Sequence, residues 1–355
     1  MFENMASRSD ADVRKIIRGC YLATDDVASL RRRLIERIKQ VVTVEASFFA
    51  VSDPDTLLFT AAWAEEPLAE AGPRFMANEF GAEADVNRFA ELARAKQPVA
   101  TLDAATGGHR PASPRFREIM APLRLGDELR VALRAGQTTW GFLCLHRAGK
   151  TGFSSRDVSI LAKIAPHAGE ALRRIVAGSL PPLRRAGGEP GIVLTESDVI
   201  VGMTGSAASW LSELCGGNVA VGDAVPLALL GVIRRLETLE HSVVRVPPPG
   251  LTIATPSGAL LEVHAARMTG IAGRGSVAIT LAPAGAAARS CLLLAARGVT
   301  PAQCRVASSV LRGLSTRQIC AELSIGEHTV QDHLKAVFQK LGVSSRRELV
   351  AALLH

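Results

Sequence analysis

Two helix-start signals close together near the carboxyl end constrain the fold more than any other feature. Thr300 is followed by Pro301 and Gln303, and Ser315 is followed by Gln318. In each pair the hydroxyl can accept from the backbone N–H three residues on, while the glutamine reaches back. Proline fits the first helical position. We therefore predict two short capped helices between residues 300 and 323, the first of them stopped by Gly313.

A third helix is predicted directly after them, beyond a tight turn through Ser324-Ile325-Gly326. Its apolar residues recur at i, i+4, i+7, i+8 and i+11, the spacing of one helical face. They are Val330, Leu334, Val337, Phe338 and Leu341. Gly342 ends this helix, and "SSRRELVAALL" (344–354) starts a fourth. A unit this small has little area for a core, so these inward positions are committed to packing.

The other face of the third helix is polar and could read DNA. Its side chains are short or hydrogen-bonding: Thr329, Gln331, Asp332, Lys335, Ala336 and Gln339. Such groups suit the base edges of a major groove, and cations at the rim suit phosphates. The flanking cations are Arg317, Lys340, Arg346 and Arg347. A solvated surface is the alternative for one helix alone, but two joined, capped helices with a basic rim favour a helix-turn-helix.

Residues 298–351 resemble the LuxR-type helix-turn-helix of bacterial transcription regulators, through the pattern "GLS", "TV", "HL", "VF" and "KLGVSSR". The resemblance implies that the third helix is the recognition helix and that the fourth serves dimer contact. It implies base reading by Gln331, Asp332 and Lys335, and backbone contacts from Thr329, Lys340 and Arg346. Asp332 departs from the neutral or basic residues common there, which bears on the target sequence, since an acid can accept from cytosine.

Two joints rich in proline, glycine and alanine divide the rest of the chain. They are "AGSLPPLRRAGGEPG" (177–191) and "LAPAGAAARS" (281–290), and neither has apolar periodicity. We therefore predict three domains, at residues 12–176, 187–284 and 291–355. The last part, 291–355, holds eight Lys and Arg against four Asp and Glu, which favours an anionic partner.

The first domain is predicted to be α/β. The elements expected are a helix at 26–42, strands at 45–53 and 56–64, a helix at 88–96, a hairpin at 127–147 and a helix from Ser154 or Ser155 to 176. This order, with "WGFLCLHRAGKTGFSSRDVSILAKIAPHAGEAL", resembles a GAF sensor domain. The apolar stripe of the last helix, from Val158 to Leu172, is expected to contribute to self-association.

The middle domain is predicted to be α+β. Strands are expected on both sides of the acidic turn in "GIVLTESDVIVGM", followed by helices around Trp210 and at 229–240. A hairpin across Pro256-Ser257-Gly258 and a closing strand in "SVAITLAP" complete it. This order of elements resembles a PAS-type domain. Together the three resemblances imply sensory domains ahead of an all-α, four-helix DNA-binding domain.

Composition excludes several other classes of protein. Hydrophobic residues make up 48% of the chain, which is typical of folded domains. The polar start "MFENMASRSDADVRK" does not resemble a signal peptide, and no apolar run is long enough to span a membrane. The six cysteines are scattered without a CxxC pair, which favours reduced thiols. These features predict a cytoplasmic protein.

Catalysis, cofactors and metals are not expected. The chain has no P-loop, no GxSxG and no HExxH. A receiver domain is rejected as well, because Asp25 and Asp26 open a helix before any strand and Asp53 lies in a turn containing proline. Trp63, Trp140 and Phe142 are candidate pocket residues, with an ordinary core as the competing interpretation. Cys144 alternates with Trp140 and Phe142, which indicates a buried strand.

The sequence therefore predicts a DNA-binding transcription regulator that is not an enzyme. Its partners are expected to be double-stranded DNA and a second copy of the chain, with RNA polymerase and a small-molecule effector as further candidates. Two alternatives stay open. One is a sigma-factor-like promoter-recognition protein, which would need a second DNA-melting domain rich in aromatic residues, whereas this chain is 4% aromatic. The other is a signalling module whose C-terminal helices serve protein contacts.

Overall fold

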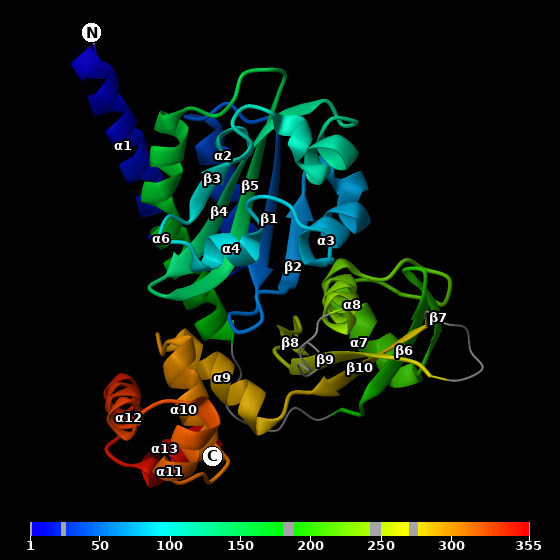
Figure 1. Cartoon of the computed structure of the whole chain (residues 1–355), viewed down its shortest axis with the longest axis vertical. Helices are drawn as coiled ribbons and strands as arrows, with labels where there is room; N and C mark the ends of the chain where they lie inside the picture. The colour runs from blue at the N-terminus through cyan, green and yellow to red at the C-terminus, as the bar shows by residue number, and fades with distance from the viewer. Residues whose placement is uncertain (1, 23–25, 180–187, 242–249, 270–275, 355) are drawn as a thin grey trace.

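The structure, a computed structural model, describes residues 2–22, 26–179, 188–241, 250–269 and 276–354 (Figure 1). Three domains follow one another along the chain: a sheet clad by helices, a second sheet, and a cluster of short helices that contains the C-terminus. Within the described residues, no helix is both long and apolar enough to cross a membrane.

The N-terminal domain is built on a five-stranded antiparallel sheet in the order β2-β1-β5-β4-β3. Its strands are β1 (Ala46–Ser52), β2 (Phe59–Ala64), β3 (Val99–Thr101), β4 (Leu125–Ala135) and β5 (Thr138–Ala148). The predicted strand pair and hairpin are present, and Gly136 turns the hairpin with a φ of 61°. A receiver domain is built on parallel strands, so this antiparallel sheet agrees with the rejection of that alternative.

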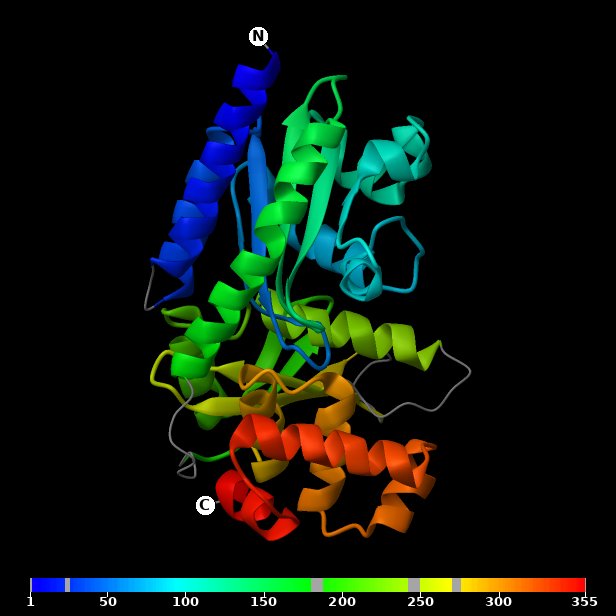
Figure 2. The same cartoon turned by 90° about the vertical axis from the view of Figure 1, so that its left-hand side faces the viewer.

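Helices cover both faces of this sheet (Figures 1 and 2). One face packs against α1 (Phe2–Tyr21), α2 (Val27–Lys39) and α6 (Ser155–Ser179). The other face carries α3 (Gly72–Phe80), α4 (Phe89–Arg94), α5 (Leu102–Ala105) and the short helical segments at 68–71 and 116–120, and a third such segment lies at 110–112. Nine consecutive residues of β4, and nine of β5, are buried, because neither face meets solvent.

The α6 helix covers its own sheet, so the expected self-association through its stripe was wrong. Leu161, Ile164 and Leu172 are each no more than 1% exposed and belong to the core between α6 and the sheet. The helix lies very close to β4 at Gly169, where an added Cβ would stand 2.4 Å from the backbone carbon of Arg134. Ser154 caps this helix, since its hydroxyl accepts from the N–H of Asp157.

The middle domain holds a second antiparallel sheet with the same topology, in the order β7-β6-β10-β9-β8. Its strands are β6 (Gly191–Glu196), β7 (Val199–Met203), β8 (Gly250–Ala254), β9 (Leu260–Arg267) and β10 (Val277–Pro283). The helices α7 (Gly205–Cys215) and α8 (Leu227–Glu240) accompany it. Burial alternates along β6 and β10, so only one face of this sheet is covered.

The two sheet domains share one apolar core. It joins the inner face of the second sheet, α8, and the α3 side of the first sheet. The hydroxyl of Thr238 in α8 donates to the carbonyl of Phe80 at the end of α3, at 2.7 Å. Of the predicted joint at 177–191, residues 180–187 lie outside the described residues, as does the predicted domain start at residue 187.

The second predicted joint is not a linker throughout. Residues 286–290 open a helix, α9 (Ala286–Ala296), which was not predicted because alanine occurs on both of its faces and gives no apolar periodicity. Its residues Leu292 and Ala295 join the core under α6, while Leu294 joins the core of the C-terminal helices. The α9 helix therefore connects the sensor-like part of the chain to the last domain through packing on both sides.

Candidate nucleic-acid interface

Both predicted capping boxes are present in the C-terminal domain. Its helices are α10 (Pro301–Leu311), α11 (Thr316–Leu323), α12 (Glu327–Leu341) and α13 (Arg346–Leu354). Thr300 and Gln303 exchange side-chain and backbone hydrogen bonds at the start of α10, and Ser315 and Gln318 do so at the start of α11. These contacts satisfy backbone N–H groups that a helix start leaves free, so they fix where each helix begins.

The turn between α11 and α12 sets the angle of the third helix. Ser324 has a φ of 53°, in the left-handed region, and the backbone N–H of Ile325 donates to the carbonyl of Cys320. Gly326 then caps α12 through its backbone alone. The apolar side of α12 enters the domain core: Val330, Leu334 and Val337 are buried, while Phe338 and Leu341 pack at its edge.

The opposite side of α12 is open to solvent. Thr329, Gln331, Asp332, Lys335 and Gln339 are all exposed. Asp332 lies 3.5 Å from the ring of His328, one turn back on the same helix. Gln331 and Lys335 form no side-chain hydrogen bond or ion pair with any described residue, so their polar atoms are available to a ligand.

The predicted phosphate-contacting cations fall into two groups. Arg317 and Arg347 are exposed and have no ion-pair partner among the described residues. Lys340 instead donates to the carbonyl of Gly298 at 2.6 Å and to the side chain of Gln303 at 2.9 Å. Arg346 donates to the carbonyl of Leu314 and the hydroxyl of Thr316. Lys340 and Arg346 therefore join helices within the domain, and a phosphate contact from either remains a prediction.

The candidate pocket residues Trp63, Trp140 and Phe142 do not all lie on one face of the sheet. Gly141 pairs with Leu133, and Thr139 with Arg134, so Trp140 is the extra residue of a bulge. The bulge turns Trp140 into the core under α6, while Phe142 faces the other side of the sheet. Trp140 and Phe142 are fully buried core residues, as the competing interpretation has it.

Trp63 does line a cavity, of about 110 Å³, between β1, β2, α3 and Leu227 of the middle domain. His146, which was not among the predicted pocket residues, lines the same cavity and is 1% exposed. Neither of its ring nitrogens has a hydrogen-bond partner among the described residues. The signal was alternation: Phe142, Cys144 and His146 are two residues apart, so all three point to one face of β5.

A network of buried charges stands beside His146. The carboxylate of Glu128 lies 2.8 Å from Nη2 of Arg115 and 3.0 Å from Nε of Arg130, and it accepts from the Cys144 thiol at 2.9 Å. Arg130 also meets Glu79 at 2.7 Å. The two guanidiniums hold the pKa of Glu128 well below its usual range despite burial. Burial lowers the pKa of His146 to about 4, so its imidazole is neutral.

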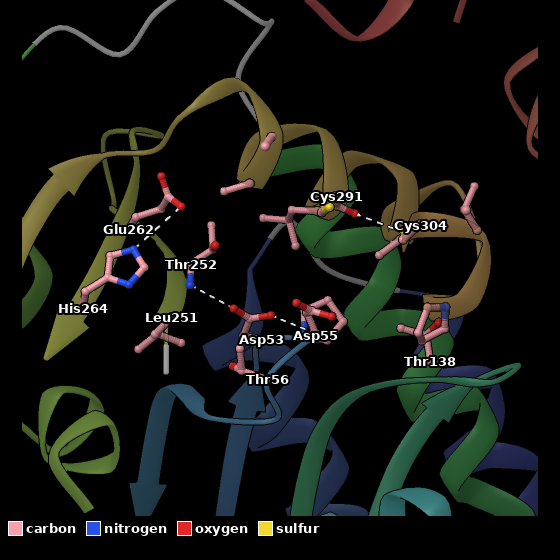
Figure 3. A pocket seen from close by; sticks show the side chains of 18 residues that line it. Asp53, Asp55, Thr56, Thr138, Leu251, Thr252, Glu262, His264, Cys291 and Cys304 are labelled. Atoms are coloured by element: carbon pink, nitrogen blue, oxygen red, sulfur yellow. Dashed lines mark hydrogen bonds and ion pairs between the residues drawn. The ribbon is translucent and has the colours of Figure 1, made fainter. Parts of the chain in front are cut away.

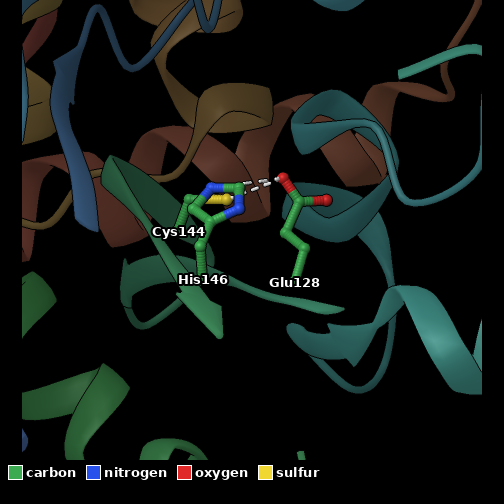
Figure 4. Close-up of side chains that lie close together, drawn as sticks. All are labelled: Glu128, Cys144 and His146. Atoms are coloured by element: carbon green, nitrogen blue, oxygen red, sulfur yellow. Dashed lines mark hydrogen bonds and ion pairs between the residues drawn. The ribbon is translucent and has the colours of Figure 1, made fainter. Parts of the chain in front are cut away.

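Glu128, Cys144 and His146 have ligand atoms within 4.8 Å of one another, a spacing that a metal ion could use (Figure 4). The charges oppose it. Both arginines already neutralise Glu128, and a divalent cation would add to their positive field. A thiol binds metals as the thiolate, and burial raises the pKa of Cys144 well above its ordinary value. This cluster is better suited to holding the sheet together.

Comparison with known protein families agrees with the arrangement of the domains. Residues 298–353 match the luxR family of bacterial regulatory proteins, and residues 26–172 match the GAF domain. The chain carries a GAF domain and a LuxR-type DNA-binding domain. It is therefore a DNA-binding transcription regulator, and α11 and α12 form its helix-turn-helix.

Other comparisons add little. The crystal structure of Escherichia coli SdiA is similar to this chain at a TM-score of 0.33 and 12% sequence identity, over 99% of each chain. That likeness is too remote to bear on function. No curated protein matches the chain.

Proposed function

We propose that this regulator binds a specific DNA sequence through the exposed face of α12 and that its GAF and middle domains respond to a small molecule. One observation carries the DNA-reading part. Gln331 and Lys335 stand one turn apart on the face of α12 that takes no part in the core, and neither is engaged by a described residue. Both can therefore donate to base edges without losing an existing contact. Asp332 belongs to the same face and would accept from a cytosine amino group.

The phosphate contacts are assigned first to Arg317 and Arg347, whose guanidinium groups are exposed and unpaired within the described part of the chain. Thr329 can add a hydroxyl contact from the first turn of α12. Lys340 uses two of its three N–H donors inside the domain, so one is left for a phosphate. Arg346 also keeps donors for a phosphate, because its guanidinium group has five N–H donors and the contacts to Leu314 and Thr316 use only some of them.

The DNA-reading proposal is tested with the full chain and a duplex selected from a random pool, beside a scrambled duplex. Lys335→Ala should weaken the selected duplex by about 1–3 kcal/mol and leave the scrambled one nearly unchanged. Arg317→Ala should weaken both alike and lower the salt slope by about one. Arg32→Ala, an exposed charge change on α2, is the matched control and should do neither.

Two outcomes would count against this proposal. If Lys335→Ala weakened both duplexes by the same factor, Lys335 would hold DNA and not read it. If the unmodified chain failed to bind any duplex at low salt, the alternative of a signalling module with protein-binding C-terminal helices would replace it. A sigma-factor-like protein would bind DNA only together with RNA polymerase, which the same assay tests by adding the polymerase.

We further propose that the middle domain is PAS-like. Its sheet has the same strand order as the GAF sheet, which supports a related sensory architecture. The GAF cavity beside His146 is our candidate effector site. Its walls are apolar apart from one imidazole that forms no hydrogen bond with a described residue, which suits a small, mostly apolar ligand with one hydrogen-bonding group. Phenol is a suitable probe, and His146→Leu should weaken its binding by about tenfold.

Dimerisation on DNA is proposed through α13. A shallow groove runs beside it, lined by Val310, Leu314, Arg347, Val350 and Ala351. An exposed apolar position such as Ala351 can pack against the same helix of a second copy. Ala351→Glu should leave the chain folded but reduce binding to a two-half-site duplex, with sedimentation reporting the loss of dimer. A DNA-binding regulator of this kind would act in the cytoplasm.

A further inference from the structure

A cavity of about 260 Å³ lies where the three domains meet (Figure 3). The GAF domain contributes the turn after β1, and the middle domain contributes residues of β8 and β9. The connecting helix α9 and the start of α10, in the LuxR-type domain, complete the lining. Because these segments are far apart in the sequence, the cavity exists only when all three domains are docked together. It is separate from the cavity beside His146.

Asp53 stands at the wall of this junction cavity and is 5% exposed. One carboxylate oxygen accepts from the backbone N–H of Thr252 in β8 at 2.8 Å, and the other accepts from that of Asp55 at 2.9 Å. Among the described residues, no Lys, Arg or His forms an ion pair with it. Burial raises its pKa to about 6, as expected for a carboxylate that has lost water without gaining a counter-charge. A buried charge of this kind is costly unless it is paired.

The rest of the lining has two characters. Asp55 and Glu262 add two more carboxyl groups, and His264 lies 3.9 Å from Glu262. No lysine or arginine is found among the described residues that line the cavity. The side formed by α9 and its neighbours is apolar, with Leu292, Ala295, Val299 and Pro301. One wall therefore attracts positive charge and the other attracts hydrocarbon.

We propose that this junction is a binding site for a small organic cation, an ammonium group carried on a compact apolar body. The ammonium would lie against Asp53 and supply its missing counter-charge, while the body would lie on α9. An anion is repelled by the three carboxyl groups. A bare metal ion would leave the apolar wall unfilled. The occupant contacts all three domains, so it stabilises their docked arrangement by mass action. This site is independent of the DNA-reading and effector proposals above.

The test uses the full chain and isothermal titration calorimetry at pH 7.5, with benzylamine as the cationic probe and benzyl alcohol as its neutral match. Benzylamine should bind with a dissociation constant of about 1 mM or tighter, and benzyl alcohol at least about tenfold more weakly. Asp53→Asn keeps an acceptor for the N–H of Thr252 but removes the charge, so it should weaken benzylamine by about tenfold or more. Glu36→Gln, an exposed charge change on α2, should leave binding unchanged.

A second variant keeps the charges and removes the space. Ala287 lines the cavity and is exposed, so Ala287→Phe should fill it without disturbing a core, and benzylamine binding should be lost. Circular dichroism checks that each variant is folded. If Asp53→Asn did not fold, Ala287→Phe and the comparison of the two probes would decide. Equal binding of amine and alcohol, unchanged binding by either folded variant, or no binding of benzylamine would overturn the proposal.

Discussion

Glu128 in the core of the GAF domain and Asp53 at the three-domain junction are both carboxylates shut off from solvent, at 1% and 5% exposure. Glu128 stands between two guanidiniums, and its pKa is held well below the usual range although burial alone would raise it. Asp53 has only backbone N–H groups for partners in the described chain, and its pKa is raised to about 6. Both carboxylates are buried, so the neighbouring groups decide whether the pKa rises or falls.

The contrast separates the rigid core around Glu128 from the junction around Asp53, where the arrangement of the domains can change. The Glu128 network ties β4 and β5 to the loops and helix that carry Arg115 and Glu79, and every member is paired. The junction holds a charge that is not compensated, in contact with a cavity that closes only when the domains dock. A regulator needs a part whose arrangement can be altered, and the junction is where a small energetic change would act on all three domains.

Removing the charge of Glu128 should give the largest effect. Glu128→Gln leaves Arg115 and Arg130 buried with less negative charge than they need, so the free energy of unfolding should fall by about 3–5 kcal/mol. Glu196→Gln, on the exposed side of β6, should change it by less than about 0.5 kcal/mol. Urea denaturation followed by far-ultraviolet circular dichroism measures both. A loss below about 1 kcal/mol for Glu128→Gln would mean that the network contributes little.

His146 makes the same region sensitive to acid. Burial lowers its pKa to about 4 from an ordinary 6.5, so between these values the unfolded chain binds a proton that the folded chain does not. Stability should therefore fall as the pH drops from 6.5 toward 4, by up to about 3 kcal/mol from this residue. His146→Gln should flatten that part of the pH profile, whereas His109→Gln, on the surface, should leave it unchanged. An identical slope in His146→Gln and the unmodified chain would contradict this.

The C-terminal domain could be predicted well because its signals are local. Thr300 with Gln303, and Ser315 with Gln318, define helix starts within four residues of sequence, and the series from Val330 to Leu341 defines a face. The strands of both sheets, apart from the short β3, were also predictable from apolar runs and turn residues. The α9 helix was not, since alanine gives no periodic contrast, and neither was α1, whose described side chains, from residue 10 on, bury only Val13, Ile16 and Cys20.

The two carboxylate sites needed the tertiary structure. Glu128 pairs with His146, and Arg130 with Cys144, across β4 and β5, but this register depends on a bulge at Trp140 that the alternation of the sequence conceals. The same bulge explains why Trp140 was placed on the wrong side. Asp53, Thr252 and Ala287 come from the GAF domain, the middle domain and the connecting helix α9. No local pattern can bring such residues together, because the contacts are made by packing between domains.

Asp53→Asn should change stability in the opposite direction from Glu128→Gln. The folded pKa of Asp53 is about 6 and its ordinary value is 3.8, so the folded chain holds a proton more tightly. The stability that this proton contributes is complete below about pH 4 and is lost as the pH rises through 6. Asparagine carries no charge at either pH, so the variant does not lose this stability as the pH rises. It should be more stable than the unmodified chain by about 1–3 kcal/mol at pH 7 and equally stable at pH 4.

The control for that change is Asp55→Asn, because Asp55 is exposed in the same turn. It should alter the free energy of unfolding by less than about 0.5 kcal/mol at either pH. Urea denaturation at pH 7 and pH 4 measures the four values. If Asp53→Asn destabilised the chain at pH 7, the hydrogen bonds that the carboxylate accepts from Thr252 and Asp55 would outweigh the cost of its uncompensated charge. The main role of Asp53 would then be to hold the GAF and middle domains together.

The smallest effect is expected from a carboxylate that is paired but not buried. Lys39 lies 2.8 Å from Glu65, and the two side chains are 33% and 36% exposed. Water screens this pair, so Lys39→Met should lower the free energy of unfolding by only about 0–1 kcal/mol, and 0.5 M salt should remove most of that difference. The buried Glu128 network should respond much less to salt. If Lys39→Met were as damaging as Glu128→Gln, pairing itself and not burial would set the energy of these sites, and the contrast between Glu128 and Asp53 would lose its physical basis.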